Sequence, residues 1–427
     1  MEANLTLEQK LDVLMTMAAD DREAPPSGGS ALPPRLRNAK ARGVGALRPL
    51  NIRNLRVTGG RVSLLRILMT NACSFNCHYC PMRRDRNLPR TLLKPEELVR
   101  VFLAAHQRGW CEGLFITTGI PARPVKVMDD LVRVLELLRE RHGFRGYVHV
   151  KIVPGAETAQ IERLTRLASR VSLNLEAPCG QSLVQIAPEK SFATSLAALD
   201  QARALVKREQ AERAEGRPRD PLHPGGAAGM TVQFVVGATQ DSDRTLLGRV
   251  TDLYAGGGVH HAHFSAFRPI RETPLEDAPA APALREQRLY QADYLLRSYG
   301  FGADEVVFDE AGNLPLGRDP KTSWALAHPE RFPVEVRTAG YEELLRVPGI
   351  GPGAARRIVA ERGGTVLRGL ADLRRLGVVT TRAAGFLTLG GRRLQTVKWT
   401  EQLGFWGPED DAGRPHLVYD VSPGTFR

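Results

Sequence analysis

The chain has 427 residues, 42% hydrophobic and 25% charged, which is typical of a folded protein with more than one domain. It has no uninterrupted apolar run of about 20 residues, and MEANLTLEQK lacks the order of a signal peptide, so we expect a cytoplasmic protein without a membrane span. Lys and Arg number 59 against 47 Asp and Glu, and this net charge of +12 predicts an anionic partner such as nucleic acid.

The first 55 residues are expected to form one helix and a basic linker. TLEQKLDVLMTMAADD has apolar residues at helical spacing, and the following DREAPPSGGSALPPRL is rich in the Pro, Gly and Ser of loops. From Arg35 to Arg66 the sequence contains nine Lys or Arg and no acidic residue. We therefore assign residues 1–55 to this N-terminal region.

Strand and helix patterns then alternate from residue 56 to residue 320. Six segments are expected to be strands: VSLLRILM, CEGLFITT, GYVHVKIV, RVSLNLEA, MTVQFVVG and VHHAHFSAF. Helical patterns such as PEELVRVFLAAHQRG and MDDLVRVLELLRERHG lie between them. This order predicts an α/β fold in which parallel strands close into a partial (β/α)6 TIM-like barrel.

Polar residues alternate along several of the expected strands and share one face. They are His149, Lys151, Ser172, Asn174, Glu176, His261, His263 and Ser265. A strand in a helix-covered parallel sheet is normally apolar on both faces, so polar side chains in the lumen need a ligand or polar partners. We expect the lumen to be an active site, and a buried polar network is the alternative.

Three of the five cysteines lie within eight residues, directly after the first expected strand. The spacing of Cys73, Cys77 and Cys80 lets one short loop supply three thiolates to a 4Fe-4S cluster and leave the fourth iron open. Structural zinc sites and structural clusters use a fourth ligand, and no second CxxC is present. The alternative is such a site completed by His78, His106 or Cys111.

After Asp319 the strand pattern stops and an Arg-rich helical region begins, which we assign to a second, all-α domain at residues 321–400 and a tail at residues 401–427. In LLRVPGIGPGAARRIV, two helices flank a glycine turn whose amides can bind an anion. The nucleic-acid-binding candidates are Gly349, Ile350, Gly351, Gly353, Arg356 and Arg357. A weaker copy follows in LADLRRLGVVTTRAAGFL, and the alternative is a hairpin that contacts protein.

CSFNCHYC resembles the CxxxCxΦC loop of the radical S-adenosylmethionine superfamily, with Tyr79 as the aromatic residue. The resemblance implies that the three cysteines hold a 4Fe-4S cluster and that its open iron binds S-adenosylmethionine. An electron from a donor such as flavodoxin or ferredoxin then gives a 5'-deoxyadenosyl radical. The segment Thr117 to Gly119 lacks the acid of the usual Gly-Gly-Glu-like motif. The implied cofactor contacts are Tyr79, Thr117, Thr118, Gly119, Asn174, Glu176, Val235, Gly237 and Arg268.

LLRVPGIGPGAARRIV resembles a helix-hairpin-helix motif, which grips the DNA backbone without reading its sequence. With GLFITTG and SAFRPI, the chain resembles a bacterial family of proposed DNA modification or repair radical S-adenosylmethionine proteins. That resemblance implies a uracil-DNA glycosylase-like partner. We expect an enzyme that modifies or repairs a nucleic-acid base or sugar, with DNA favoured. The alternatives are an RNA-modifying radical enzyme and a non-catalytic DNA-binding protein with a structural cluster.

Overall fold

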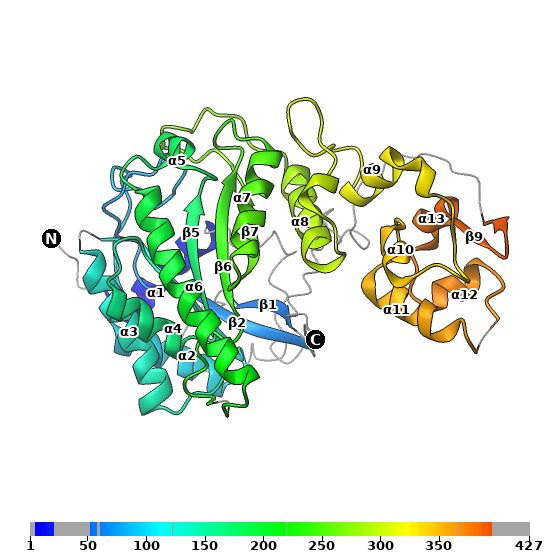
Figure 1. The fold of residues 1–427 in the computed structure, drawn as a ribbon. Helices are drawn as coiled ribbons and strands as arrows, with labels where there is room; N and C mark the ends of the chain where they lie inside the picture. The colour runs from blue at the N-terminus through cyan, green and yellow to red at the C-terminus, as the bar shows by residue number, and fades with distance from the viewer. Residues whose placement is uncertain are drawn as a thin grey trace, which may run out of the picture. The chain divides into compact units, whose positions relative to one another are not determined.

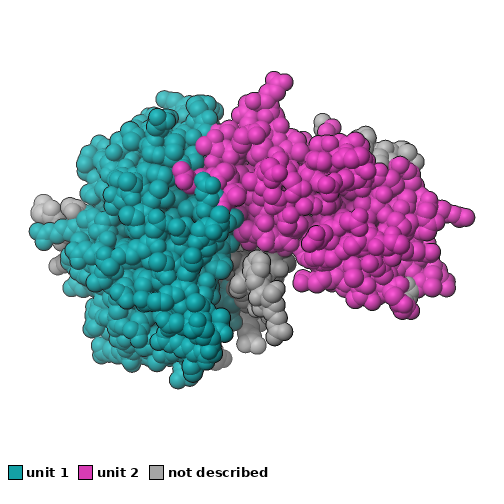
Figure 2. Space-filling view, viewed as in Figure 1, with its two compact units in different colours: residues 1–241, 252–281, 406–427 teal, residues 242–251, 282–405 magenta. Residues whose placement is uncertain are grey.

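The computed structural model describes residues 5–20, 52–57, 60–121, 123–218, 220–364 and 366–394. The chain divides into two compact units (Figure 2). The first comprises residues 1–241, 252–281 and 406–427, and the second comprises residues 242–251 and 282–405. Most of the expected basic linker, and the expected tail, lie outside the described residues. Within the described residues, no helix combines the length and apolar character needed to cross a membrane.

A seven-stranded sheet forms the centre of the first unit, with its strands side by side in chain order (Figure 1). The strands are β1 (Ile52–Val57), β2 (Gly60–Leu68), β3 (Gly113–Thr117), β4 (Val148–Lys151), β5 (Arg170–Glu176), β6 (Met230–Val236) and β7 (Val259–Ala266). Strands β2 to β7 are parallel, so the six predicted strands and the partial barrel are confirmed. The antiparallel strand β1 begins in the segment that was expected to be a basic linker and extends two residues past its predicted end at residue 55.

Helices connect the parallel strands and lie along the outside of the curved sheet (Figure 1). They include α2 (Pro95–Gln107), α3 (Pro124–Glu136), α4 (Thr158–Leu167), α5 (Gly180–Ile186) and α6 (Phe192–Ala214), whereas α1 (Leu7–Asp20) precedes the sheet in the chain. Helix α2 begins with a proline, which is tolerated there because the first N–H of a helix has no carbonyl partner within the helix. The helix buries Leu98, Val101 and Phe102 on one face. The outer face of the sheet is therefore apolar, and its polar residues are left on the lumen side.

The second unit packs helices around a core that includes Trp324, Val336, Leu344 and Ile358. Its helices are α8 (Ala283–Ser298), α9 (Pro320–Ala327), α10 (Tyr341–Arg346), α11 (Pro352–Glu361), α12 (Leu370–Arg375) and α13 (Thr380–Ala383). Most of α7 (Asp243–Ala255) also belongs to it. The expected all-α domain additionally contains a small sheet of β8 (Val334–Glu335), β9 (Leu387–Leu389) and β10 (Arg392–Arg393).

The main segment of the second unit begins at Pro282, earlier than the boundary at residue 321 expected from the end of the strand pattern. Helix α8 belongs to this unit because its side chains hold the segment that leads to α9. Buried Arg288 donates two hydrogen bonds, of 3.1 and 2.7 Å, to the carbonyl oxygen of Leu316. Arg285 forms an ion pair of 2.7 Å with buried Asp243 of α7. Helical character starts at residue 283, although the Arg-rich region starts later.

Candidate functional site

A cavity at the carboxyl ends of the parallel strands brings together residues from the cysteine loop and from five strands. It contains about 1080 Å³ of space free of protein atoms, part of it open to solvent. Its wall includes these predicted residues: Cys73, Cys77, Cys80, Tyr79, Thr117, Thr118, Gly119, Asn174, Glu176, Val235 and Arg268. Gly237, also predicted, lies outside this wall, in a turn after β6 where its φ is 82°.

Main-chain hydrogen bonds fix the cysteine loop against its two neighbours, the end of β3 and helix α5. The amide of Ser74 donates to the carbonyl of Ile120 over 2.7 Å, and the amide of His78 donates to the carbonyl of Ile186 over 2.8 Å. Gly119 allows the closest approach, because a Cβ there would overlap the carbonyl oxygen of Ala72. The position of the three thiols thus depends on backbone contacts outside the sheet.

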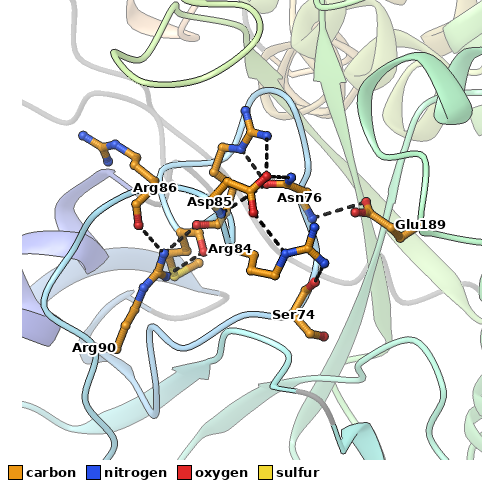
Figure 3. Close-up of polar contacts among 9 residues, drawn as sticks. Ser74, Asn76, Arg84, Asp85, Arg86, Arg90 and Glu189 are labelled. Carbon is orange, nitrogen blue, oxygen red and sulfur yellow. Dashed lines mark hydrogen bonds and ion pairs between the residues drawn. The ribbon is translucent and has the colours of Figure 1, made fainter. Parts of the chain in front are cut away.

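A network of polar side chains braces the outer part of the loop (Figure 3). At its centre is Asn76, between the first two cysteines, whose Oδ1 accepts a hydrogen bond of 2.7 Å from Nε of Arg83. The side-chain Nδ2 of Asn76 donates to Asp85, and the main-chain N–H of Asn76 donates to Oε2 of Glu189 over 3.2 Å. The hydrogen bond from Asn76, followed by that from Arg84, lowers the pKa of Asp85. The carboxylate therefore stays charged and keeps the turn closed.

The chemistry of the three thiols fits an iron–sulfur cluster. Burial raises the pKa of the Cys77 thiol to about 11 and raises that of Cys80 as well, so the free thiols hold protons that bound iron replaces. Among the described residues, no three His, Cys, Asp or Glu side chains are arranged as ligands of a single metal ion. A cluster needs no such convergence, because each thiolate binds a different iron.

The residues considered as a fourth ligand are engaged elsewhere. Nδ1 of His78 lies 2.9 Å from the carbonyl oxygen of Gln185. Nδ1 of His106 lies 2.9 Å from the carbonyl oxygen of Cys111. Neither His106 nor Cys111 lines the cavity. The alternative of a site closed by one of these residues is therefore not supported by the geometry.

A buried ion pair that the sequence did not predict lies in the same wall. Nζ of Lys190 is 2.7 Å from Oε1 of Glu176, and their side chains are 9% and 3% exposed. Burial disfavours the charged form of both side chains, but their mutual attraction and hydrogen bond outweigh this effect. The pKa of Glu176 is therefore lowered and that of Lys190 is raised. Glu176 has a φ of 65° and lies beside a bulge in β5. If its carboxylate binds the cofactor as predicted, the cofactor and Lys190 bind the same carboxylate.

The polar lumen expected from strand alternation is present and is only partly satisfied. Ser172 lies beside Thr231, and Asn174 lies beside Gln233, across β5 and β6. Among the described residues, one buried oxygen of each side chain has no hydrogen-bond partner. Such an atom costs roughly 1–3 kcal/mol when it stays unpaired. Of these four residues, Asn174 and Gln233 line the cavity. Their unpaired oxygens favour a bound polar ligand or water there over a self-contained polar network.

In the second unit, a hairpin between α10 and α11 contacts a second hairpin before α13. Gly349 has a φ of 82°, and a Cβ there would lie 2.5 Å from the carbonyl oxygen of Val379. The amide of Val379 in turn donates to the carbonyl of Gly349 over 2.9 Å. Gly377 of the second hairpin has a φ of 84°. The two hairpins therefore meet backbone to backbone.

The hairpin residues predicted to bind nucleic acid have different surroundings. Arg356 is exposed at the start of α11, and a Cβ at Gly353 would meet only the end of the Arg357 side chain, at 3.5 Å. Nε of Arg357 donates to the carbonyl of Leu376 over 2.9 Å and so braces the second hairpin. The side chain of Ile350 is buried, and its carbonyl accepts a hydrogen bond from Lys321.

Comparison with known proteins adds a family match to this geometry. A model of the Radical SAM superfamily matches residues 67–209, the stretch that holds the cysteine loop and β3 to β5. The cofactors of that superfamily are a 4Fe-4S cluster and S-adenosylmethionine, which agree with the three thiols and the polar wall. No curated protein matches the chain significantly.

Several solved structures resemble the chain in part. The FeFe-hydrogenase maturase HydG from Carboxydothermus hydrogenoformans is 17% identical, with 57% of this chain and 52% of that chain covered and a TM-score of 0.43. Methylornithine synthase, PylB, is 13% identical over 57% of this chain and 62% of that chain, with a TM-score of 0.42. SuiB from Streptococcus suis, solved with the precursor peptide SuiA, is 14% identical over 66% and 53%, with a TM-score of 0.39. The chain spans about half the length of HydG and SuiB.

We expect Gly119→Ala to lower the iron bound per chain after anaerobic reconstitution, because the added methyl displaces the Ala72 carbonyl and with it the cysteine loop. Gly248→Ala is the matched control, since a Cβ at that helical position meets no atom within 4 Å. Iron assay and the absorbance of the cluster measure the effect. Equal iron content in the two variants would contradict this role for Gly119.

Glu176→Ala should lower the free energy of unfolding by about 3–5 kcal/mol, because it leaves the buried ammonium of Lys190 without its partner. Adding Lys190→Met should restore most of that loss, since the second change removes the unpaired charge. Denaturant unfolding of the iron-free protein measures both. A double variant as unstable as Glu176→Ala would show that the pair does not act as a unit.

Proposed function

The chain contains a radical S-adenosylmethionine domain, and from this premise we propose that it modifies or repairs a base or sugar of DNA. The superfamily consists of enzymes that cleave S-adenosylmethionine reductively, and this is the chemistry its cofactors supply when bound. The protein's part is to hold both cofactors, to orient the substrate and to exclude water from the cavity.

The cavity wall provides the residues for these tasks. Cys73, Cys77 and Cys80 would hold the cluster. The polar contacts to S-adenosylmethionine would come from Thr117, Thr118, Gly119, Asn174, Glu176 and Arg268, and Val235 would contact its adenine. Tyr79 lines the same cavity and lies beside the Glu176 carboxylate. Gln233 is the added candidate for the substrate, since its buried oxygen lacks a partner among the described residues.

The observation that carries the choice of nucleic acid is the first hairpin of the second unit. Helix α11 follows Gly351 without a side-chain cap, and since Pro352 has no N–H, the amides of Gly353 and Ala354 are the first ones in the helix that a phosphate oxygen would meet. Exposed Arg356 adds a positive charge one turn further along the helix. From Tyr341 to Lys398 there are eleven Lys or Arg against four Asp or Glu, a balance of +7. Contacts of this kind hold a nucleic-acid backbone without reading its bases.

A nucleotide that reacts in the cavity has to leave the base stack, as in other enzymes that act on bases. The polar lumen can hydrogen-bond an extruded base, because amide and hydroxyl side chains both donate and accept. An electron donor such as flavodoxin or ferredoxin would reduce the cluster, and a uracil-DNA glycosylase-like protein would act on the same DNA. These partners are part of the proposal.

Gly353→Glu should weaken DNA binding about equally for unrelated sequences, because the new carboxylate repels phosphate at the start of α11. It should fold normally, since an acid is favourable in the first turn of a helix. Gly363→Glu, placed in open space beyond the same helix, is the control. Fluorescence anisotropy should show that the DNA affinity of Gly353→Glu falls less steeply with salt concentration than that of the wild type, by the slope of about one phosphate contact. Equal affinity of both variants would remove the hairpin from the nucleic-acid contact.

Anaerobic incubation with S-adenosylmethionine, a reductant and DNA should give a nucleoside of new mass after digestion. The Cys73→Ala, Cys77→Ala, Cys80→Ala triple variant should give none, because it lacks all three cluster ligands. Parallel reactions with structured RNA separate the two nucleic acids. If 5'-deoxyadenosine forms and neither nucleic acid changes mass, the proposed substrate is wrong although the radical chemistry stands.

A further inference from the structure

One side chain, Arg90, joins the two ends of the cysteine loop, and Figure 3 shows its contact with Arg86 at the end of the loop. Its Nη1 donates to the carbonyl oxygens of Asn71, at 2.6 Å, and Met82, at 2.8 Å. Its Nη2 donates to those of Arg83, at 2.5 Å, and Arg86, at 3.0 Å. Asn71 precedes the first cysteine, and the other three residues follow the last one. A single guanidinium thus ties together the start and the end of the loop.

The backbone that carries Arg90 is itself fixed to the end of β2. Nδ2 of Asn71 donates to the carbonyl of Pro89 over 2.8 Å, and the amide of Thr91 donates back to Oδ1 of Asn71 over 2.8 Å. Oγ1 of Thr70 donates to the carbonyl of Thr91 over 2.8 Å. The guanidinium is therefore held in place before any ligand binds, and little side-chain entropy is lost when the loop closes around a cluster.

Arg90 also carries a positive charge, which is bound to the carbonyl two residues before Cys73 and to the carbonyl two residues after Cys80. Its hydrogen-bond partners among the described residues are neutral carbonyls, and no carboxylate there forms an ion pair with it. Partial burial lowers the pKa of Arg90, while the negative charge of Cys73 and Cys80 opposes that shift. Exposed Arg84, by comparison, is paired with Asp85 over 3.1 Å. No acid among the described residues neutralises the charge of Arg90, which can therefore stabilise the thiolates of Cys73 and Cys80 once iron has replaced their protons.

We propose that Arg90 is a positioning residue for the iron–sulfur cluster, which holds the cysteine loop closed through four carbonyls and stabilises added electron density on the cluster by its charge. The charge effect follows because reduction makes the cluster more negative, and a nearby cation lowers the energy of that state. This role concerns the cluster alone, so it is independent of whether the substrate is nucleic acid.

Two variants separate the two parts of the role. Arg90→Lys keeps the charge but lacks the planar fork that reaches four carbonyls, and Arg90→Gln loses both. Arg100→Gln is the control, because it removes an exposed arginine of α2, outside the cysteine loop. The readouts are the rate of iron release to a chelator and the midpoint potential of the cluster, followed by electron paramagnetic resonance. Neither readout requires a substrate.

Both Arg90 variants should release iron faster, on the order of 10- to 100-fold, as expected when a residue that supports metal ligands is lost. The midpoint potential should fall in Arg90→Gln and stay closer to that of the wild type in Arg90→Lys. Folded variants that bind no iron at all would also support the clamp. Wild-type iron release in both variants would overturn the clamp, and equal potentials in the two variants would overturn the charge effect.

Discussion

Three thiols on one short loop have to face a single cavity, and the rest of the site is arranged around this requirement. The loop lies beyond the ends of the strands, where buried Cys77 belongs to a small apolar cluster against which Phe75 and Tyr79 pack. Backbone contacts with β3 and α5 add to this packing, and the approach at Gly119 is the closest of them. Asn76 braces the outer turn, and Arg90 joins the two ends. Loss of one of these contacts should move sulfur atoms without unfolding the barrel.

Burying polar groups in the cavity wall costs folding free energy, and apolar packing on the outside of the barrel offsets this cost. Helices α2, α3 and α4 each bury several large apolar side chains against the sheet. This packing allows the lumen to keep a buried ion pair and side-chain oxygens without partners among the described residues. Groups that are left unsatisfied in the folded chain can instead form hydrogen bonds to a ligand when it binds.

The sequence predicted what depends on local spacing. The six parallel strands could be found because each has its own pattern and ends near a helix start, and the cysteines lie on one loop by their spacing alone. It did not predict β1, whose basic residues resemble a linker. Lys190 and Arg90 gave no signal, because their partners become neighbours only through tertiary contacts. The assignment of Arg357 could not be refined either, since the sequence does not show which side of α11 meets the second hairpin.

The contact between the two hairpins limits how the second unit can be divided. Gly349 and Val379 share a main-chain hydrogen bond, and Arg357 reaches the carbonyl of Leu376 from the helix that follows the first hairpin. A fragment that stops before α12 would lose both supports, and its glycine turn would have no surface to rest on. The smallest piece that could be grafted onto another protein therefore runs through both hairpins.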